Sequence, residues 1–412
     1  MRSPHGHGLD RVWSSFLAVG RREFERSATG PAEQTPHFTE KNRWRLLPIE
    51  SRSSWLADGT YEHGNWTAGF WFGVMWLVAR GTKQSEVAAL ARDRLKGLAA
   101  RATDSTTHDL GFLFYPSYVL GELLGFIPQG DAIPARQAAR MLGRRFNARG
   151  GYIQAFGSIG DDRTAGTSTI DTMMNLPLLW RTAHDWDPIL FDVARLHART
   201  SARLFIREDG STYHLIRLDS VSGALVHRGT FQGASAESCW SRGQAWAVCG
   251  FAWAYAATGE PELLSAATRT AAYFWAHLPG DGVPPWDFSD TSSDAERDAS
   301  ASAIAAVGAL ILGRVHPEET QRSRHWTQAT TLLDKLATCV NESEHTEGIL
   351  TRSCYSKPHG LGLTCATAWG DFFFGLGLAL ALGVVPLHAA LGFRLPSLAS
   401  AEETARDTST IS

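Results

Sequence analysis

The sequence has no long uninterrupted apolar run. Its longest, Phe372–Val385, is broken by glycines and stops at Pro386. Such a run is too short to cross a bilayer, and a buried helix explains it better. The first residues, MRSPHGHGLDRVW, also lack the apolar core of a secretory signal. We therefore expect neither secretion nor a membrane partner.

Cysteine and excess charge of one sign are scarce too. The five cysteines form no CxxC pair and have no regular spacing, so they predict neither a disulfide framework nor a zinc site and fit a reducing cytoplasm best. The formal net charge of -3 argues against a nucleic-acid partner, which favours a clearly basic surface. No HExxH, P-loop or dinucleotide fingerprint stands in a fitting context, so no metal or cofactor is expected.

What the chain has in quantity is helical periodicity. About twelve segments show it, with strand-like alternation weak outside Thr212–Val226. Prolines stand at several of the expected helix starts, where no N–H donor is needed. The segments begin near Leu9, Trp66, Ser85, Phe112, Pro134, Asp171, Pro188, Trp240, Pro261, Ser300, Pro317 and Ala368.

These segments alternate in character. Six are rich in Gly, Ala and aromatics with little charge, as helices buried on most sides are, whereas the segments between them mix charged and apolar residues. The alternation predicts an all-α fold, an (α/α)6 barrel with an inner and an outer ring. We expect residues 1–396 to form this single domain. The polar tail 397–412 lacks periodicity and is expected to be disordered.

Loop lengths predict which end of the barrel carries the site. Links from an inner helix to the next outer helix are short, while four links from outer to inner helices are long: Arg149–Ile170, Arg207–Cys239, Pro279–Ala299 and Asn341–Thr367. Long loops in a compact domain usually carry function. They would lie at the N-terminal ends of the inner helices, where free N–H groups favour an anionic ligand.

Two aspartates stand at this predicted face. Asp109, in HDLGF, and Asp171, in TIDTMMN, each precede an inner helix. Either residue alone is adequately explained as a helix N-cap. Together, at the same level of neighbouring inner helices, they are placed to hold two carboxylates across a sugar ring.

Basic and aromatic residues accompany the aspartates. Arg242, in CWSRGQAW, stands among tryptophans near a helix start, a position that suits bidentate binding of a carboxylate or sulfate. His214 and Gln232 lie on the long loop before it. Aromatic faces beside fixed charges indicate a carbohydrate-active enzyme. Spacing leaves open whether Trp66 and Trp71 pack in the core or offer a platform to a sugar.

The order of these motifs resembles that of the unsaturated glucuronyl hydrolases. The resemblance rests on NWTAGFWFGVMW, HDLGF, IDTMMNLPLL, DGSTYH, FQG, WSRGQAWA, PPWDF and AWGDFFF. It covers roughly residues 44 to 382 and implies the same (α/α)6 barrel. It also implies removal of a 4,5-unsaturated uronic acid from small lyase-generated oligosaccharides, by hydration of the C4=C5 vinyl ether.

The resemblance also implies residue roles. Asp171 would be the general acid and base, and Asp109 would orient it and stabilise positive charge in the ring. His214, Gln232 and Arg242 would hold the uronate, with Arg242 as the main carboxylate contact. Trp66, Trp240 and Trp246 would shape the pocket and stack on the sugar.

Two departures from the family pattern concern the aglycone. Phe156, in GGYIQAFG, stands where many members carry tryptophan, so stacking area and an N–H donor are lost. In RSCYSKPHG, Ser353, Ser356 and Lys357 resemble the serines and lysine of sulfate-preferring members, with the lysine displaced by one position. This similarity gives the hypothesis that sulfated disaccharides are accepted.

Three alternatives stay open at the level of sequence. One is a conventional inverting glycosidase that uses Asp109 and Asp171 as acid and base. Another is a sugar-binding protein that has lost catalysis. The third is a tailoring enzyme that performs the same chemistry on an unusual aglycone.

Overall fold

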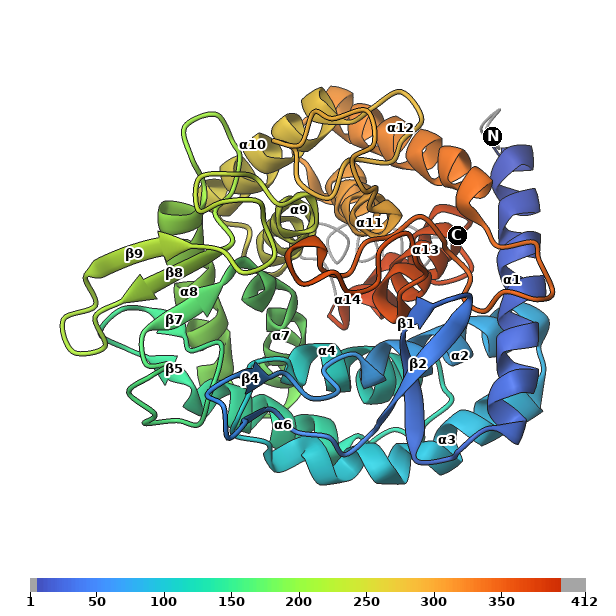
Figure 1. Ribbon diagram of the computed structural model, residues 1–412, viewed down its shortest axis with the longest axis horizontal. Coiled ribbons are helices and arrows are strands. Elements are labelled where there is room, and N and C mark those ends of the chain that lie inside the picture. Colours follow the sequence, from blue (N-terminus) through green and yellow to red (C-terminus); the bar gives the residue numbers. More distant parts are fainter. Residues whose placement is uncertain (1–5, 394–412) are drawn as a thin grey trace, which may run out of the picture.

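The structure, a computed structural model, describes residues 6–393. Its helices form two concentric rings, seen end-on in Figure 1. The inner helices are α2 (Ala68–Thr82), α4 (Leu110–Phe114) with its continuation α5 (Leu120–Leu123), α7 (Leu176–Asp185), α9 (Ser241–Thr258), α11 (Ala299–Val315) and α13 (Ala368–Ala381). The outer helices are α1 (Gly6–Thr29), α3 (Ser85–Ala99), α6 (Ile133–Arg144), α8 (Ile189–Phe205), α10 (Pro261–His277) and α12 (Glu319–Lys335).

The inner ring is closed. Around it α2 packs on α4, α4 on α7, α7 on α9, α9 on α11, α11 on α13, and α13 returns to α2. Every residue from Ala299 to Gly313 of α11 is buried, whereas α6 buries only a stripe of Ala135, Ala138, Ala139 and Leu142. This difference matches the predicted alternation of buried and amphipathic helices. The predicted (α/α)6 barrel is confirmed.

Short helical turns complete the helical part. A π turn, Tyr115–Val119, joins α4 to α5, and α14 (Leu387–Leu391), which the sequence did not predict, follows Pro386. The 3-10 turns are Ala100–Thr103, Ile170–Met174, Leu336–Cys339 and Lys357–His359. None of the described helices is both long enough and apolar enough to span a membrane. The predicted disordered tail 397–412 lies outside the described residues.

Short antiparallel strands lie in the long loops. The strands are β1 (Gln34–Glu40), β2 (Arg43–Pro48), β3 (Ser54–Trp55), β4 (Tyr61–Glu62), β5 (Phe146–Asn147), β6 (Tyr152–Ile153), β7 (Thr167–Thr169), β8 (Leu215–Leu218) and β9 (Leu225–Gly229). They pair as β1–β2, β3–β4, β5–β6 and β7–β8–β9. In the three-stranded sheet, Leu215 of β8 lies between Thr169 and Gly229.

The β1–β2 hairpin corrects the expectation that strand structure is weak outside Thr212–Val226. Glu40 pairs with Arg43 across the two-residue turn Lys41–Asn42, in which both residues have positive φ, 48° and 67°. This turn suits the twist of a hairpin. Five consecutive residues of β1 are buried, so the strand shows no alternation of polar and apolar residues to detect.

One close backbone contact fixes two neighbouring inner helices. A Cβ on Gly111, in α4, would lie 2.3 Å from the Cα of Asn175. The Asn175 Oδ1 accepts a hydrogen bond from the Phe112 N–H at 2.8 Å. This contact joins the segment after Asp109 to the segment after Asp171.

Candidate active site

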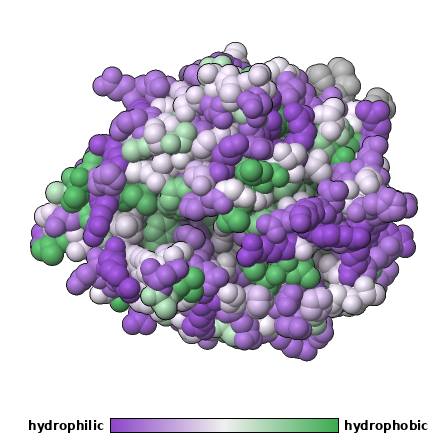
Figure 2. All heavy atoms as spheres, in the orientation of Figure 1, coloured by the Kyte–Doolittle hydropathy of each residue, from purple (hydrophilic) through white to green (hydrophobic). Residues whose placement is uncertain are grey.

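The structure brings together residues at the starts of the inner helices and in the loops that precede them. Figure 2 shows this end of the barrel, where hydrophobic side chains border a hollow near the centre. The two predicted aspartates stand on adjacent inner segments: Asp109 directly precedes α4, and Asp171 lies in the 3-10 turn before α7. His108 Nδ1 and Thr172 Oγ1 lie 2.7 Å apart and tie the two segments together.

Neither aspartate acts as a helix cap. Asp109 occupies the N-cap position of α4, but its side chain accepts no capping hydrogen bond. Asp171 lies inside its turn, after Thr169 at the cap. Capping alone therefore does not explain the two carboxyl groups.

Asp109 is buried beside a neutral histidine. Its Oδ2 accepts from Thr107 Oγ1 at 2.7 Å, and its Oδ1 lies 3.3 Å from His108 Nε2. Burial raises the pKa of Asp109 to about 6 and lowers the pKa of His108 to about 3. The cost of placing charge away from water favours the neutral form of both groups.

Asp171 has a carboxyl oxygen without a protein partner. Its Oδ2 is buried, makes no hydrogen bond within the described chain, and lies 3.7 Å from the equally unpartnered His214 Nε2. Burial, and then the negative charge of Asp109, raise the pKa of Asp171 to about 7. An acid with this pKa carries its proton on a substantial fraction of molecules at neutral pH.

His214 is held with its ring toward this carboxyl group. Its Nδ1 lies 2.9 Å from Thr230 Oγ1, and burial lowers its pKa to about 3, so the ring is neutral. The gap of 3.7 Å between His214 Nε2 and Asp171 Oδ2 exceeds a direct hydrogen bond. A substrate hydroxyl or a water placed there would satisfy both atoms.

Arg242 differs from its expected role as an open carboxylate-binding fork. The guanidinium is almost fully buried, at 1% exposed, and pairs with Asp298 Oδ2 at 2.6 Å. Its Nη1 also donates to the Cys354 carbonyl, and its Nη2 donates to Gln232 Oε1 and the Tyr355 carbonyl. The protein thus uses all the hydrogens of the two terminal nitrogens. An arginine has a fifth N–H, at Nε, so a contact of Arg242 with the uronate carboxylate stays a prediction.

Aromatic rings line the site. The His214 ring centroid lies 4.5 Å from Trp240 and 4.3 Å from Phe231. On another side, the half-buried Trp66 stacks on Trp369 at 5.0 Å. Trp240 therefore lies beside His214, and Trp66 packs against the start of α13. That either ring stacks on a sugar stays a prediction.

Two other tryptophans lie deeper. Trp246 is fully buried and packs between Phe112 and Phe373, so the expectation that it stacks on a sugar is wrong. Trp71 is also buried and faces Ser27 and Arg94. For Trp71 the structure favours the packing interpretation.

Phe156 lies at the rim of the site. Its ring is half-buried and lies 5.4 Å from His63 and 5.5 Å from Phe231. Its backbone forms a bridge to Thr107, two residues before Asp109. The sequence analysis did not single out His63 or Phe231, which complete this aromatic rim.

The segment expected to meet sulfate is only partly available. Ser353 is fully buried, with its backbone paired to Cys365, so it cannot reach a sulfate on a sugar outside. The Ser356 hydroxyl lies 2.7 Å from His359 Nδ1, and Lys357 Nζ lies 3.9 Å from Glu296 Oε1. Of Ser353, Ser356 and Lys357, only Lys357 is exposed.

Sequence reasoning did not single out His108, Tyr355 or Asp298 as site residues. Asp298 caps α11, accepting from the Ser300 N–H, and it also pairs with Arg242. The only signal for His108 was its place beside Asp109 in HDLGF. Within residues 6–393, no group of three or more His, Cys, Asp or Glu side chains is arranged to hold a metal ion.

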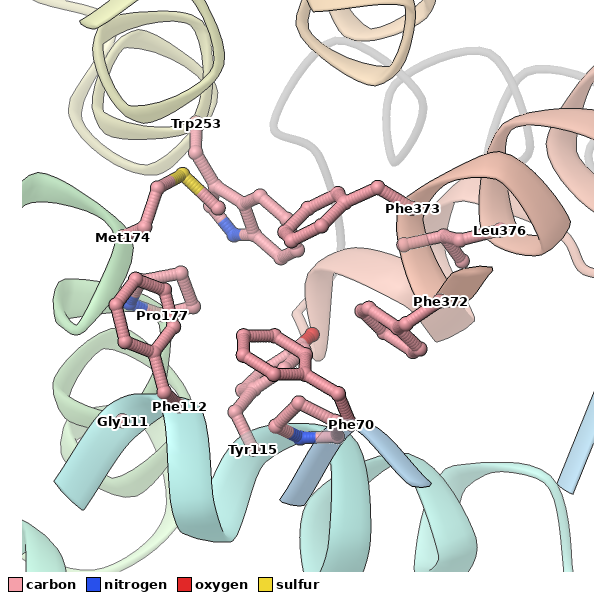
Figure 3. Close-up of a pocket in the computed structure, with 11 residues that line it drawn as sticks. Phe70, Gly111, Phe112, Tyr115, Met174, Pro177, Trp253, Phe372, Phe373 and Leu376 are labelled. Atoms are coloured by element: carbon pink, nitrogen blue, oxygen red, sulfur yellow. The ribbon is translucent and has the colours of Figure 1, made fainter. Parts of the chain in front are cut away.

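Beneath the aspartates the barrel interior is apolar. A small cavity there is lined by residues from five inner helices and the turn before α7, and Figure 3 shows their side chains pointing toward one another. Phe112, from the segment after Asp109, and Met174, from the segment after Asp171, form part of its wall. This apolar floor gives both carboxyl groups a low-dielectric neighbour, consistent with their raised pKa values.

Comparisons with known proteins agree with this architecture. The chain is 36% identical over 349 residues to an unsaturated glucuronyl hydrolase of Bacillus sp. (strain GL1), covering 80% of this chain and 90% of the relative. It is 32% identical over 322 residues to an unsaturated chondroitin disaccharide hydrolase of Streptococcus pyogenes serotype M1, covering 76% and 80%. No family model matches the chain.

A solved structure gives the same result in three dimensions. The crystal structure of the Bacillus sp. GL1 enzyme, described as responsible for the degradation of glycosaminoglycan, aligns with a TM-score of 0.82 and 31% identity. The alignment covers 91% of this chain and 97% of that one. Sequence identity and fold thus agree over most of both chains. This protein therefore belongs to the unsaturated glucuronyl hydrolase family.

Proposed function

We propose that this protein removes the 4,5-unsaturated uronic acid from the non-reducing end of small lyase-generated oligosaccharides by hydrating the C4=C5 bond. The observation that carries the proposal is the unpartnered Oδ2 of Asp171, 3.7 Å from His214 Nε2, on a carboxyl group whose pKa is raised to about 7. A proton donor is thus available near neutral pH, beside aromatic rings that suit a sugar.

The reaction follows from the chemistry of a vinyl ether. Protonated Asp171 delivers its proton to C4, and the cation that forms at C5 is delocalised onto the ring oxygen. Asp171, now a carboxylate, accepts a proton from a water that attacks C5. The hemiketal then opens and expels the aglycone, leaving a keto-uronate. Asp109, when ionised, stabilises positive charge in the ring.

The experiment is optical. Hydration destroys the conjugated double bond, so the ultraviolet absorbance of the substrate should disappear as aglycone is released. Unsaturated disaccharides from chondroitin, hyaluronan and heparin, and oligosaccharides from gellan and xanthan, would be compared. A conventional inverting glycosidase would release the sugar with its double bond intact, so the absorbance would decay only afterwards, as the free sugar opens to an enol and tautomerises. Binding with no turnover on any of these substrates would favour a sugar-binding protein instead.

We propose an unsulfated aglycone as the better substrate. The Lys357 ammonium, the expected sulfate partner, already faces Glu296, and Ser353 is buried. Phe156 and Phe231 at the rim support an aglycone with an apolar ring face. An unusual aglycone from a specialised pathway would fit the same rim. Faster turnover of sulfated than of unsulfated disaccharides would contradict this preference.

We also propose that residues 1–396 act as one catalytic domain in the cytoplasm, without a nucleic-acid or membrane partner. The closed inner ring supports a single domain, because its last helix, α13, packs on its first, α2. All five cysteines are unpaired and buried, which is the usual state of thiols in a reducing compartment. Fractionation of the host cell would test the location.

A further inference from the structure

Arg242 is the centre of a buried polar network. Its guanidinium lies between two indole rings, 4.5 Å from Trp240 and 5.1 Å from Trp369. Nη1 donates to Asp298 and to the Cys354 carbonyl, and Nη2 donates to Gln232 and to the Tyr355 carbonyl. Each terminal nitrogen of arginine carries two hydrogens, so these four bonds occupy all of them. A substrate oxygen meets no unused hydrogen at the ends of this guanidinium.

The network fixes the orientation of Gln232. Arginine can only donate hydrogen bonds, so the oxygen of the Gln232 amide must face it, at 2.8 Å from Nη2. The amide Nε2, with two hydrogens, therefore faces away from Arg242. It has no partner within the part of the chain that the structure describes. Gln232 also follows Phe231, whose ring lies 4.3 Å from the His214 ring, so this donor stands at the edge of the site.

Asp298 is the carboxylate that anchors this network. Its side chain is fully buried and serves two helices at once: Oδ1 accepts from the Ser300 N–H at the start of α11, and Oδ2 accepts from Arg242 in α9. Both tasks need an acceptor oxygen. An asparagine has only one, so it would lose either the cap or the bond to Arg242.

We propose that Asp298 is a positioning residue: through Arg242 it holds the Gln232 amide with Nε2 turned toward the uronate. The identity of the bound sugar rests on the function proposed above, whereas the network itself does not. A buried arginine deprived of its carboxylate partner leaves an uncompensated charge. Loss of the carboxylate should therefore disturb Arg242 and release Gln232.

A double-mutant cycle tests the proposal. Asp298→Asn and Gln232→Met should each raise KM by about tenfold or more while kcat changes little, since one uniform binding contact is lost. The double variant should be no worse than the poorer single variant, because both changes remove the same contact. The matched control is Glu122→Gln, which breaks another poorly exposed pair, Arg181–Glu122, between α5 and α7. It should lower Tm and leave KM unchanged.

Several outcomes would overturn the proposal. They are an unchanged KM in Asp298→Asn, or KM effects that multiply in the double variant. If Asp298→Asn does not fold, the Gln232→Met variant serves as the test, because it removes no buried charge. An unchanged KM in Gln232→Met rejects the role of Gln232.

A crystal structure of Asp298→Asn without substrate separates this inference from the proposed function. A displaced Gln232 amide supports the positioning role, and an unmoved Arg242 and Gln232 reject it. A wild-type protein that leaves the absorbance of every unsaturated substrate unchanged would reject the proposed function alone.

Discussion

The two aspartates owe their chemistry to where they are buried. Each has a raised pKa, and for each the largest cause is removal from water rather than a neighbouring charge. The apolar floor formed by residues such as Phe112 and Met174 is part of that environment. Sequence motifs identified both residues, but the unpartnered oxygen of Asp171 is a property of the folded chain.

Replacing Asp171 by asparagine should abolish turnover while largely sparing binding. The side chain keeps its shape but loses the transferable proton, and general acid–base catalysis is typically worth about a hundredfold or more in kcat. Loss of substrate absorbance measures turnover, and calorimetry measures binding. Asp219→Asn, in the exposed turn between β8 and β9, is the control and should retain activity. An active Asp171→Asn enzyme would mean that the proton comes from elsewhere.

The pH profile of kcat/KM should be bell-shaped. Activity requires protonated Asp171, so it should fall as the pH rises above about 7; it also requires ionised Asp109, so it should fall as the pH drops below about 6. Because the two carboxyl groups are coupled, the apparent values belong to the pair. In Asp109→Asn the residual activity should lose its acidic limb. A profile that rises steadily through pH 8 would contradict the assignment of Asp171 as the acid.

Elements meet at the site through backbone contacts as well as side chains. The absence of a side chain at Gly111 lets α4 approach Asn175 closely enough to bring Asp109 and Asp171 onto adjoining segments. Helix starts were predicted well because prolines and changes of periodicity mark them locally. The β1–β2 hairpin was missed because its first strand is buried on both faces.

Gly111→Ala should impair both stability and activity. The new Cβ would lie 2.3 Å from a backbone atom of Asn175, so α4 must move away from α7, at a cost of about 1–3 kcal/mol of unfolding free energy. The movement should separate the two aspartates and lower kcat/KM. Urea unfolding and the absorbance assay would measure the two effects.

The matched control is Gly97→Ala in the outer helix α3. A Cβ there meets nothing closer than 3.8 Å. It should stabilise the protein by about 0.5–1 kcal/mol, since alanine favours a helix more than glycine does. Equal behaviour of the two alanine variants would show that the contact at Gly111 does not constrain the barrel.

At the scale of the whole molecule, the fold buries every cysteine, although only Cys249 lies in an inner helix. Cys239, Cys249, Cys339, Cys354 and Cys365 are all buried and unpaired, and burial raises the pKa of Cys239 and Cys354 to about 12. A thiol-specific reagent should therefore label none in the native protein and five after unfolding without reductant. Reductant should leave Tm unchanged. Fewer than five thiols in the unfolded protein would indicate a disulfide.

The sequence by itself determined the barrel and predicted which of its ends carries the two aspartates. Alternation between wholly apolar and amphipathic helices is a local pattern, and it dictates which segments can be buried on all sides. The motifs around Asp109, Asp171 and Arg242 were readable for the same reason, since each is contiguous in the chain.

Only the tertiary structure decided which polar groups remain available. Arg242 forms hydrogen bonds to Asp298, 56 residues away in the sequence, and to the Cys354 carbonyl, 112 residues away. Local sequence periodicity does not predict contacts between residues so far apart. The same applies to Trp246, whose burial depends on Phe112 and Phe373 from other helices. A side chain's chemistry depends on the partners left to it once distant segments have packed together.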